Sequence, residues 1–267
     1  MRDEAAVSPL MKAIAILALV VLLLPVAIVV LAGLNAGEYL PFPPQGLSLR
    51  WVWAFLSSPT FMGAYLYSFV LALVTTLISA ALGTLASIYL SRSRGRAAAA
   101  LRGFFMLPIV LPGVVLGLAL YVFYVSTDIG LARSFPGLLI GNVLVTFPFV
   151  VATVTASMVG FDLSLEEAAR SLGASPWTAF RKITLRLIAP GISAGSIFAF
   201  IVSFGQFETT LFLTVPNHEP LPMAMYISLR YKFEPTAAAA GIFAIALVAL
   251  STVVSARLVS LRRVFRA

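Results

Sequence analysis

Residues 160–192 read GFDLSLEEAARSLGASPWTAFRKITLRLIAPGI, and their pattern predicts a helix, a turn and a second helix. Ser164 and Glu167 fit an S-x-x-E capping box, in which two side chains satisfy free backbone N–H groups at a helix start. Gly173 fits the end of that helix. Ser175, followed by a proline, fits the start of the second helix, which we expect to end in a basic turn.

The first of these helices is amphipathic. Its apolar residues recur at helical spacing: Leu165, Ala168, Ala169 and Leu172. One interpretation is a helix that lies in the membrane interface, where amphipathic helices bind. The other is a docking surface for a partner protein. The two alanines favour docking, because interfacial anchors normally use bulkier apolar residues and small side chains let a partner approach the backbone.

On both sides of this segment the chain is too apolar for water. Of its 267 residues, 61% are hydrophobic and 10% are charged, against about 45–50% and about 25% in a soluble domain. This composition excludes a soluble enzyme and a disordered chain. The chain has no Cys and a single histidine, His218, which excludes thiolate sites and histidine-based metal clusters.

Six apolar segments reach the roughly 20 residues that a helix needs to cross the ~30 Å hydrocarbon core. They cover approximately residues 13–33, 64–90, 104–125, 138–158, 188–215 and 237–258. Lipid offers no partner for backbone groups, and none of the segments alternates as barrel strands do. We therefore expect an all-α membrane protein whose residues 1–267 form one transmembrane domain. Pro108 and Pro112 predict a kink in the third segment.

The basic residues of the loops predict the orientation in the membrane. The net charge of +8 would suggest nucleic acid in a soluble protein, but cytoplasmic loops of membrane proteins are also rich in Lys and Arg. One side holds 14 of these residues: Arg2, Lys12, Arg92, Arg94, Arg96, Arg102, Arg170, Arg181, Lys182, Arg186, Arg257, Arg262, Arg263 and Arg266. The other side holds 4: Arg50, Arg133, Arg230 and Lys232. We therefore expect both termini in the cytoplasm.

Polar residues inside the fifth segment are candidates for a permeation path. They are Ser203, Gln206, Glu208, Thr209 and Thr210. Glu208 is the only acid within the six apolar segments. A charge at the centre of a membrane helix costs about 2.5–3.5 kcal/mol on insertion scales and usually faces the bundle interior or a water-filled cavity. The alternative is a structural ion pair or a helix–helix hydrogen bond, which also applies to Asn142 and Thr146 of the fourth segment.

The spacing of six residues in the loop matches a known motif: Glu167, Ala168, Ala169, Gly173, Ile183 and Leu185. They resemble the EAA loop of bacterial ABC importer permeases, except that Arg186 replaces a final proline. Residues 46–51 (GLSLRW) and 106–121 (MLPIVLPGVVLGLALY) resemble the spermidine/putrescine-type permease subunits. The resemblance covers most of residues 46–260.

This resemblance implies the type I ABC importer permease fold, with six transmembrane helices and a cytoplasmic coupling helix in the loop 160–187. The helix would dock on an ATPase subunit, with Glu167 as the charged contact. The residues that the resemblance assigns to this coupling are Glu166, Glu167, Ala168, Ala169, Leu172, Gly173 and Ala174.

The resemblance also implies the partners of the chain. They are an ABC ATPase dimer, a second homologous permease subunit that forms a heterodimer, a periplasmic binding protein and the bilayer of the bacterial inner membrane. The sequence has no G-x-x-x-x-G-K-[ST] phosphate loop. We therefore expect no cofactor and no enzymatic site on this chain, with ATP and Mg²⁺ on the ATPase, and no nucleic acid partner.

The residues of the path bear on the substrate. Polyamine-type relatives tend to read S-F-D-[DE]-V-V-[IV]-T where this chain reads SFGQFETT over residues 203–210, so the acidic pair is absent. Glu208 is three residues beyond position 205, which predicts a nearby face of one continuous helix. One carboxylate fits a polycation poorly. A polyamine, a smaller amine, an amino-acid-like zwitterion and an anion all stay open as substrates.

An ion-gradient-driven secondary transporter or channel is the alternative function. That class would predict more intramembrane charge and inverted repeats, and the EAA spacing argues against it. A membrane-embedded hydrolase would need a catalytic constellation that one intramembrane acid and one loop histidine do not provide.

The charge distribution generates a topology test. A reporter that is active only in the periplasm, fused after Ala267, should stay silent because the positive-inside bias keeps the C-terminus in the cytoplasm. The same reporter placed after Arg133 should be active. Strong periplasmic activity of the C-terminal fusion would contradict the six-span topology.

Overall fold

A computed structural model describes residues 9–38, 43–93, 95–159, 162, 164–231 and 235–264. Gly160, Phe161 and Leu163 of the quoted loop, and the basic residues Arg94 and Lys232, lie outside the described residues. The described part is helical and contains no β-strand. Its helices are α1 Pro9–Gly33, α2 Arg50–Ser57, α3 Pro59–Arg92, α4 Arg96–Val110, α5 Gly113–Thr127, α6 Phe135–Met158, α7 Ser164–Ser171, α8 Pro176–Ala179, η1 Phe180–Thr184, α9 Leu185–Phe204, α10 Thr210–Leu213, α11 Leu221–Tyr231 and α12 Thr236–Val264.

The all-α membrane fold is confirmed. Within the described residues, five helical runs are long and apolar enough to cross a membrane, and a bent pair of helices raises the number to as many as six. The runs begin at Pro9, Pro59, Phe135, Pro176 and Thr236. These runs match the predicted segments 13–33, 64–90, 138–158 and 237–258 to within a few residues. The run from Pro176 overlaps the predicted segment 188–215 but differs from it at both ends.

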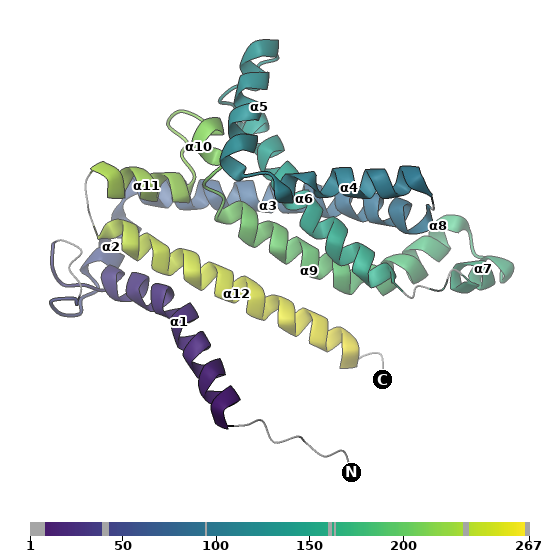
Figure 1. The fold of residues 1–267 in the computed structure, drawn as a ribbon, viewed down its shortest axis with the longest axis horizontal. Coiled ribbons are helices and arrows are strands. Elements are labelled where there is room, and N and C mark those ends of the chain that lie inside the picture. Colours follow the sequence, from purple (N-terminus) through teal and green to yellow (C-terminus); the bar gives the residue numbers. More distant parts are fainter. Residues whose placement is uncertain are drawn as a thin grey trace. The chain divides into compact units, whose positions relative to one another are not determined.

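The third predicted segment is a sharply bent pair instead of one kinked helix. α4 and α5 meet at an angle of 103°, and Figure 1 shows α5 turning away from the line of α4. Leu111 is extended, with φ −75° and ψ 133°. The next residue is Pro112, and a proline pushes the residue before it out of the helical region. Pro108 lies inside α4 without ending it, so Pro112 is the cause of the break.

The fifth predicted segment is also broken, and it starts earlier than predicted. α8, η1 and α9 form one continuous helical run from Pro176 to Phe204. The basic residues that we expected at the end of a separate second helix therefore lie within the root of the span. At the other end the helix stops at Phe204, and α10 begins only at Thr210. The prediction of one helix over residues 188–215 was therefore wrong.

Contacts divide the chain into two units. One comprises the described residues of Met1–Met62 and Met225–Ala246, and the other those of Gly63–Ala224 and Leu247–Ala267. The first unit packs through Phe55, whose ring stacks on Phe243 with centroids 4.5 Å apart. Gly33 of α1 lies directly against Ala238 of α12. The prediction of a single transmembrane domain stays a prediction.

The second unit is organised around the pairing of α6 with α9. α4 also packs against α6, and the three helices run side by side in Figure 1. Val150, Val154 and Ile188 are fully buried in the core of this pair. The backbones come close because Gly191 faces α6, where a Cβ would lie 2.7 Å from the Thr153 carbonyl oxygen. Small residues at such contacts are typical of helix packing in membranes.

This close approach predicts the effect of adding one methyl group. Gly191→Ala should destabilise the protein by about 1–3 kcal/mol, the usual cost of overpacking a tight core. Gly103→Ala is the matched control, because a Cβ on Gly103 of α4 would meet nothing within 4 Å. The measurement is thermal unfolding of the purified protein in detergent. Equal stability of the two variants would contradict the packing described here.

Candidate functional site

The N-terminus of α7 is held by Asp162. Its Oδ1 accepts a hydrogen bond from the Ser164 N–H at 2.9 Å. Hydrogen bonds from the Ser164 hydroxyl and N–H lower the pKa of the Asp162 carboxyl below its ordinary value, because they favour the charged form. The predicted capping residue, Ser164, is thus the first residue of the helix rather than its cap. The signal for this was Asp162 itself, two residues before it.

The C-terminus of α7 follows the prediction. Gly173 has φ +90°, a region that residues with a Cβ rarely adopt. Its N–H donates to the Arg170 carbonyl and the Ala174 N–H to the Ala169 carbonyl, both at 3.0 Å. This pair of bonds is a Schellman motif. The predicted cap of the following helix is confirmed, since the Ser175 hydroxyl accepts from the Thr178 N–H at 3.2 Å.

The outer surface of α7 carries the predicted coupling residues. The helix has no buried residue, and Glu167 and Ala168 are exposed, whereas Ala169 and Ala174 are half-buried. Leu172 is 89% exposed. Trp177 of α8 is also exposed and stacks on Phe180. The exposed residues of α7 and of the turn after it therefore include an acid, an alanine and a leucine.

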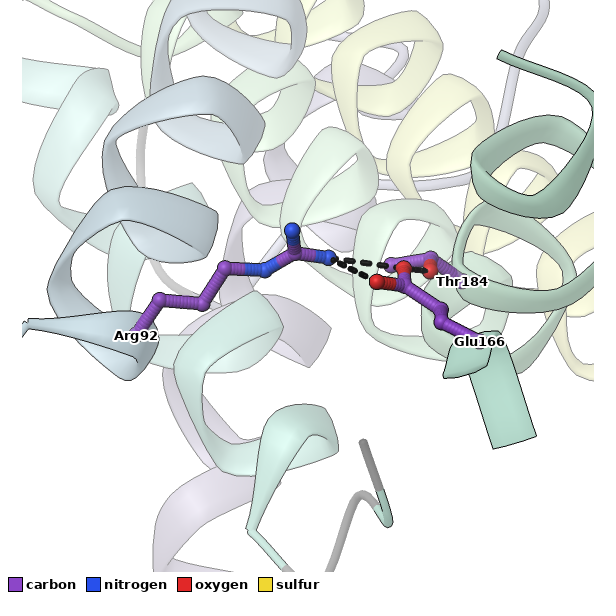
Figure 2. A network of polar contacts seen from close by, with 3 residues as sticks. All are labelled: Arg92, Glu166 and Thr184. Atoms are coloured by element: carbon purple, nitrogen blue, oxygen red, sulfur yellow. Dashed lines mark hydrogen bonds and ion pairs between the residues drawn. The ribbon is translucent and has the colours of Figure 1, made fainter. Parts of the chain in front are cut away.

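Glu166 differs from the other predicted coupling residues because it points inward. Figure 2 shows its carboxylate between Arg92 and Thr184. The Arg92 Nη2 donates to Oε1 at 2.7 Å and to Oε2 at 3.0 Å, and the Thr184 hydroxyl also donates to Oε1. The Glu166 side chain is 16% exposed and Thr184 is fully buried. Sequence reasoning missed both partners, because nothing in their local patterns marks them.

A second cluster of polar residues lies where two helices are interrupted. The Gln206 Nε2 donates to the Thr209 hydroxyl at 2.7 Å, and that hydroxyl lies 3.3 Å from the Gly113 carbonyl oxygen, to which it donates. The break between α9 and α10 therefore meets the break between α4 and α5. Gly117 of α5 makes this contact possible, because a Cβ there would lie 2.8 Å from the Thr209 carbonyl oxygen.

Glu208 lies in the same cluster and is exposed. A Cβ on Gly113 would lie 2.9 Å from the Cβ of Glu208, so the acid stands at the N-terminus of α5. The helix-face argument that placed positions 205 and 208 on one continuous helix was wrong, because α9 ends at Phe204. Interrupted backbone at membrane depth is tolerated where it is covered by protein or lines a water-filled cavity.

The other two predicted path residues bind each other. The Ser203 hydroxyl donates to the Asn142 Oδ1 at 2.9 Å, and both residues are buried. Thr146 is paired in the same way with Ser79 at 2.7 Å. In this conformation these side chains form hydrogen bonds between helices. A structural helix–helix hydrogen bond is the alternative role that the sequence left open for Asn142 and Thr146. The candidate path residues that are not fully buried therefore lie at the helix break: Glu208 is exposed and Gln206 is half-buried.

The comparison with protein families matches residues 81–264 to the family described as "Binding-protein-dependent transport system inner membrane component". The chain belongs to this family. It is an ABC importer permease subunit, a component of an inner-membrane transport system. The match includes the loop, α7 and the helix break, so the predicted recognition of the family is confirmed. The relatives that it resembles are transport permeases rather than enzymes.

The relatives are named for different solutes. The chain is 28% identical to the spermidine/putrescine transport system permease protein PotC of Escherichia coli (strain K12), over 80% of each chain. It is 33% identical to the molybdenum transport system permease protein ModB of Mycobacterium tuberculosis (strain ATCC 25618 / H37Rv), over 70% of this chain and 75% of that protein. The fold is similar to a crystallised bacterial alginate ABC transporter chain, with a TM-score of 0.71 and 17% identity over 92% of each chain.

The geometry of the helix break predicts the effect of removing the Glu208 charge. If Glu208 contacts a cationic or zwitterionic substrate, Glu208→Gln should slow transport roughly tenfold, because a hydrogen bond to a charged group is worth about 1.5–3 kcal/mol. The measurement is uptake into proteoliposomes together with the yield of assembled complex. A structural role would instead lower the yield. Unchanged transport at normal yield would exclude a required charge at this position.

Proposed function

We propose that this chain forms part of the path by which a small solute crosses the bacterial inner membrane after release from a periplasmic binding protein. An ABC ATPase dimer drives the movement and docks on α7. ATP and Mg²⁺ bind on that ATPase, because this sequence contains no phosphate loop. A second, homologous permease subunit completes the path.

The outer surface of α7 is the observation that carries this proposal. Glu167 and Ala168 stand exposed, as does Leu172. A carboxylate at a helix surface can pair with a basic side chain of a partner, and a small alanine beside it lets that partner approach closely. The alternative, a helix that lies in the membrane interface, explains the two exposed leucines, Leu165 and Leu172. It does not explain why Ala168 shares their face or why the acid Glu167 is exposed, because interfacial helices are rich in bulky apolar and basic residues.

We further propose a small amine or an amino-acid-like compound as the substrate. The support is the single exposed carboxylate of Glu208 beside the half-buried Gln206 amide. One carboxylate matches one ammonium group, whereas a polyamine carries several positive charges along its length. The relatives named above differ in their solutes, so the chemistry at the helix break is a better guide to the substrate than overall similarity.

A reversal of charge at Glu167 tests the docking. Glu167→Lys should abolish most binding-protein-stimulated ATP hydrolysis and transport, because like charges would oppose across the contact. Glu38→Lys, the same change at an exposed residue of the loop before α2, is the control. The measurement is ATP hydrolysis by the reconstituted complex with and without the binding protein. Normal stimulation in the Glu167→Lys complex would contradict docking at α7.

The turn after α7 offers a second variant for the same experiment. Gly173→Val should reduce coupling, because a residue with a Cβ at positive φ costs roughly 1–2 kcal/mol. A Cβ on Gly173 would meet nothing within 4 Å in this chain, so the strain within the chain comes from the backbone. Gly173→Asn is the matched control, since asparagine tolerates this conformation. Equal loss in both variants would contradict the conformational explanation.

A further inference from the structure

Three helical elements meet at the carboxylate of Glu166, and one of them, α3, is distant in the sequence. Arg92 is the last residue of α3, Glu166 lies in the first turn of α7, and Thr184 is the last residue of the π-helix η1. The three side chains point toward one another in Figure 2. We call this set, Arg92, Glu166 and Thr184, the carboxylate clamp.

The clamp is built more firmly than an ordinary surface ion pair. Exposed pairs are worth about 0–1 kcal/mol because water screens them. Here the carboxylate accepts from one guanidinium nitrogen through both oxygens, and from a fully buried hydroxyl. Arg92 also stands at the C-terminus of α3, where the helix dipole favours a positive charge. Removing the acid would deprive the buried Thr184 hydroxyl of this acceptor.

The other contacts of α7 show which helices the clamp connects. α7 packs on α8 and η1, which are the root of the run that continues as α9. The bond to Arg92 adds a connection to a different long helix, α3. π-helical turns are rare and often occur at functional sites, and here the turn ends at the residue that contacts Glu166. The clamp therefore joins α7 to two long helices through one side chain.

We propose that Glu166 is a positioning residue for energy coupling: the clamp makes α7, α3 and the root of α9 move together. A displacement of α7 is then delivered to two spanning helices at once. Without the clamp, α7 can tilt on α8 while α3 stays in place, so ATP is hydrolysed with less transport. This inference rests on the proposed docking of an ATPase on α7. It gives the two adjacent acids different tasks, since Glu167 contacts the partner and Glu166 holds the helix.

A double-mutant cycle on the reconstituted complex tests the clamp. The variants are Arg92→Gln, Glu166→Gln and the two together, and the control is Arg96→Gln, which removes an exposed arginine at the start of α4. The readouts are the amount of ATPase subunit that co-purifies, the thermal stability of the complex, and the substrate transported per ATP hydrolysed. Transport per ATP is the decisive readout, because a merely structural role would change yield or stability without changing this ratio.

Each single variant should retain the ATPase subunit and lose about fivefold or more in transport per ATP, the usual lower bound for coupling between sites. The double variant should be no worse than the poorer single, because both changes break one interaction. Arg92→Lys keeps the positive charge but replaces the planar guanidinium by an ammonium group on a different stem, and it should give an intermediate ratio. Arg96→Gln should behave as the unmodified chain.

Three results would overturn the clamp. The first is an unchanged ratio in Arg92→Gln, whose side chain lies at a partly exposed helix end and needs no burial of the new amide. The second is a double variant whose loss of transport per ATP equals the product of the two single losses, because independent effects multiply. The third is loss of the ATPase subunit from Glu166→Gln, which would make this acid a docking contact. Failure of the unmodified chain to bind or stimulate any ATPase would instead contradict the proposed function.

Discussion

Backbone N–H and C=O groups have no water to bind inside a lipid bilayer, and this constraint shapes the chain at every level. It forces the long apolar segments into helices. It also makes each interruption of a helix depend on a partner within the protein. The break between α9 and α10 meets the break between α4 and α5, and the Thr209 hydroxyl of one donates to the Gly113 carbonyl oxygen of the other. The polar cluster is thus a structural consequence of two breaks as well as a candidate path.

The short helix α7 lies outside the long apolar runs, and it is stabilised differently. Where water is available, a helix as short as α7 can be stabilised by side chains and turns at its two ends. Asp162 holds one end and the turn at Gly173 holds the other. Charged side chains can stand on its surface without a large desolvation cost. A docking helix is therefore compatible with this loop and not with the spans.

The sequence was sufficient for the elements that depend on composition and local spacing. Apolar length located the spans, and the turn at Gly173 and the cap at Ser175 followed from their residue types. Apolar length could not locate the end of α9, because the predicted segment continues past Phe204 to residue 215. It could not show that Pro112 breaks the third segment, since Pro108 lies four residues earlier and is accommodated within α4. Which of two prolines ends a helix depends on packing around it.

Side-chain direction was the other limit of sequence reasoning at the site. The EAA spacing placed Glu166 and Glu167 together as coupling residues, but neighbours on an α-helix point about 100° apart. Their side chains therefore cannot share one environment. Glu166 points inward because it binds Arg92, which is 74 residues away in the sequence. No local pattern contains that information, because it depends on how α3 ends beside α7.

The different roles proposed for Glu166 and Glu167 have a physical reason. A helix that receives a push from a partner needs an exposed group for the partner and an anchored group for its own scaffold. Two adjacent carboxylates on one helix supply both, because the helical twist directs one outward and the other toward the protein. The inward acid has fixed donors and is partly shielded from water, so salt screens it less than the outward one. In the proposed docking, the outer contact forms and dissociates while the inner one persists, and α7 transmits force although no residue of it is buried.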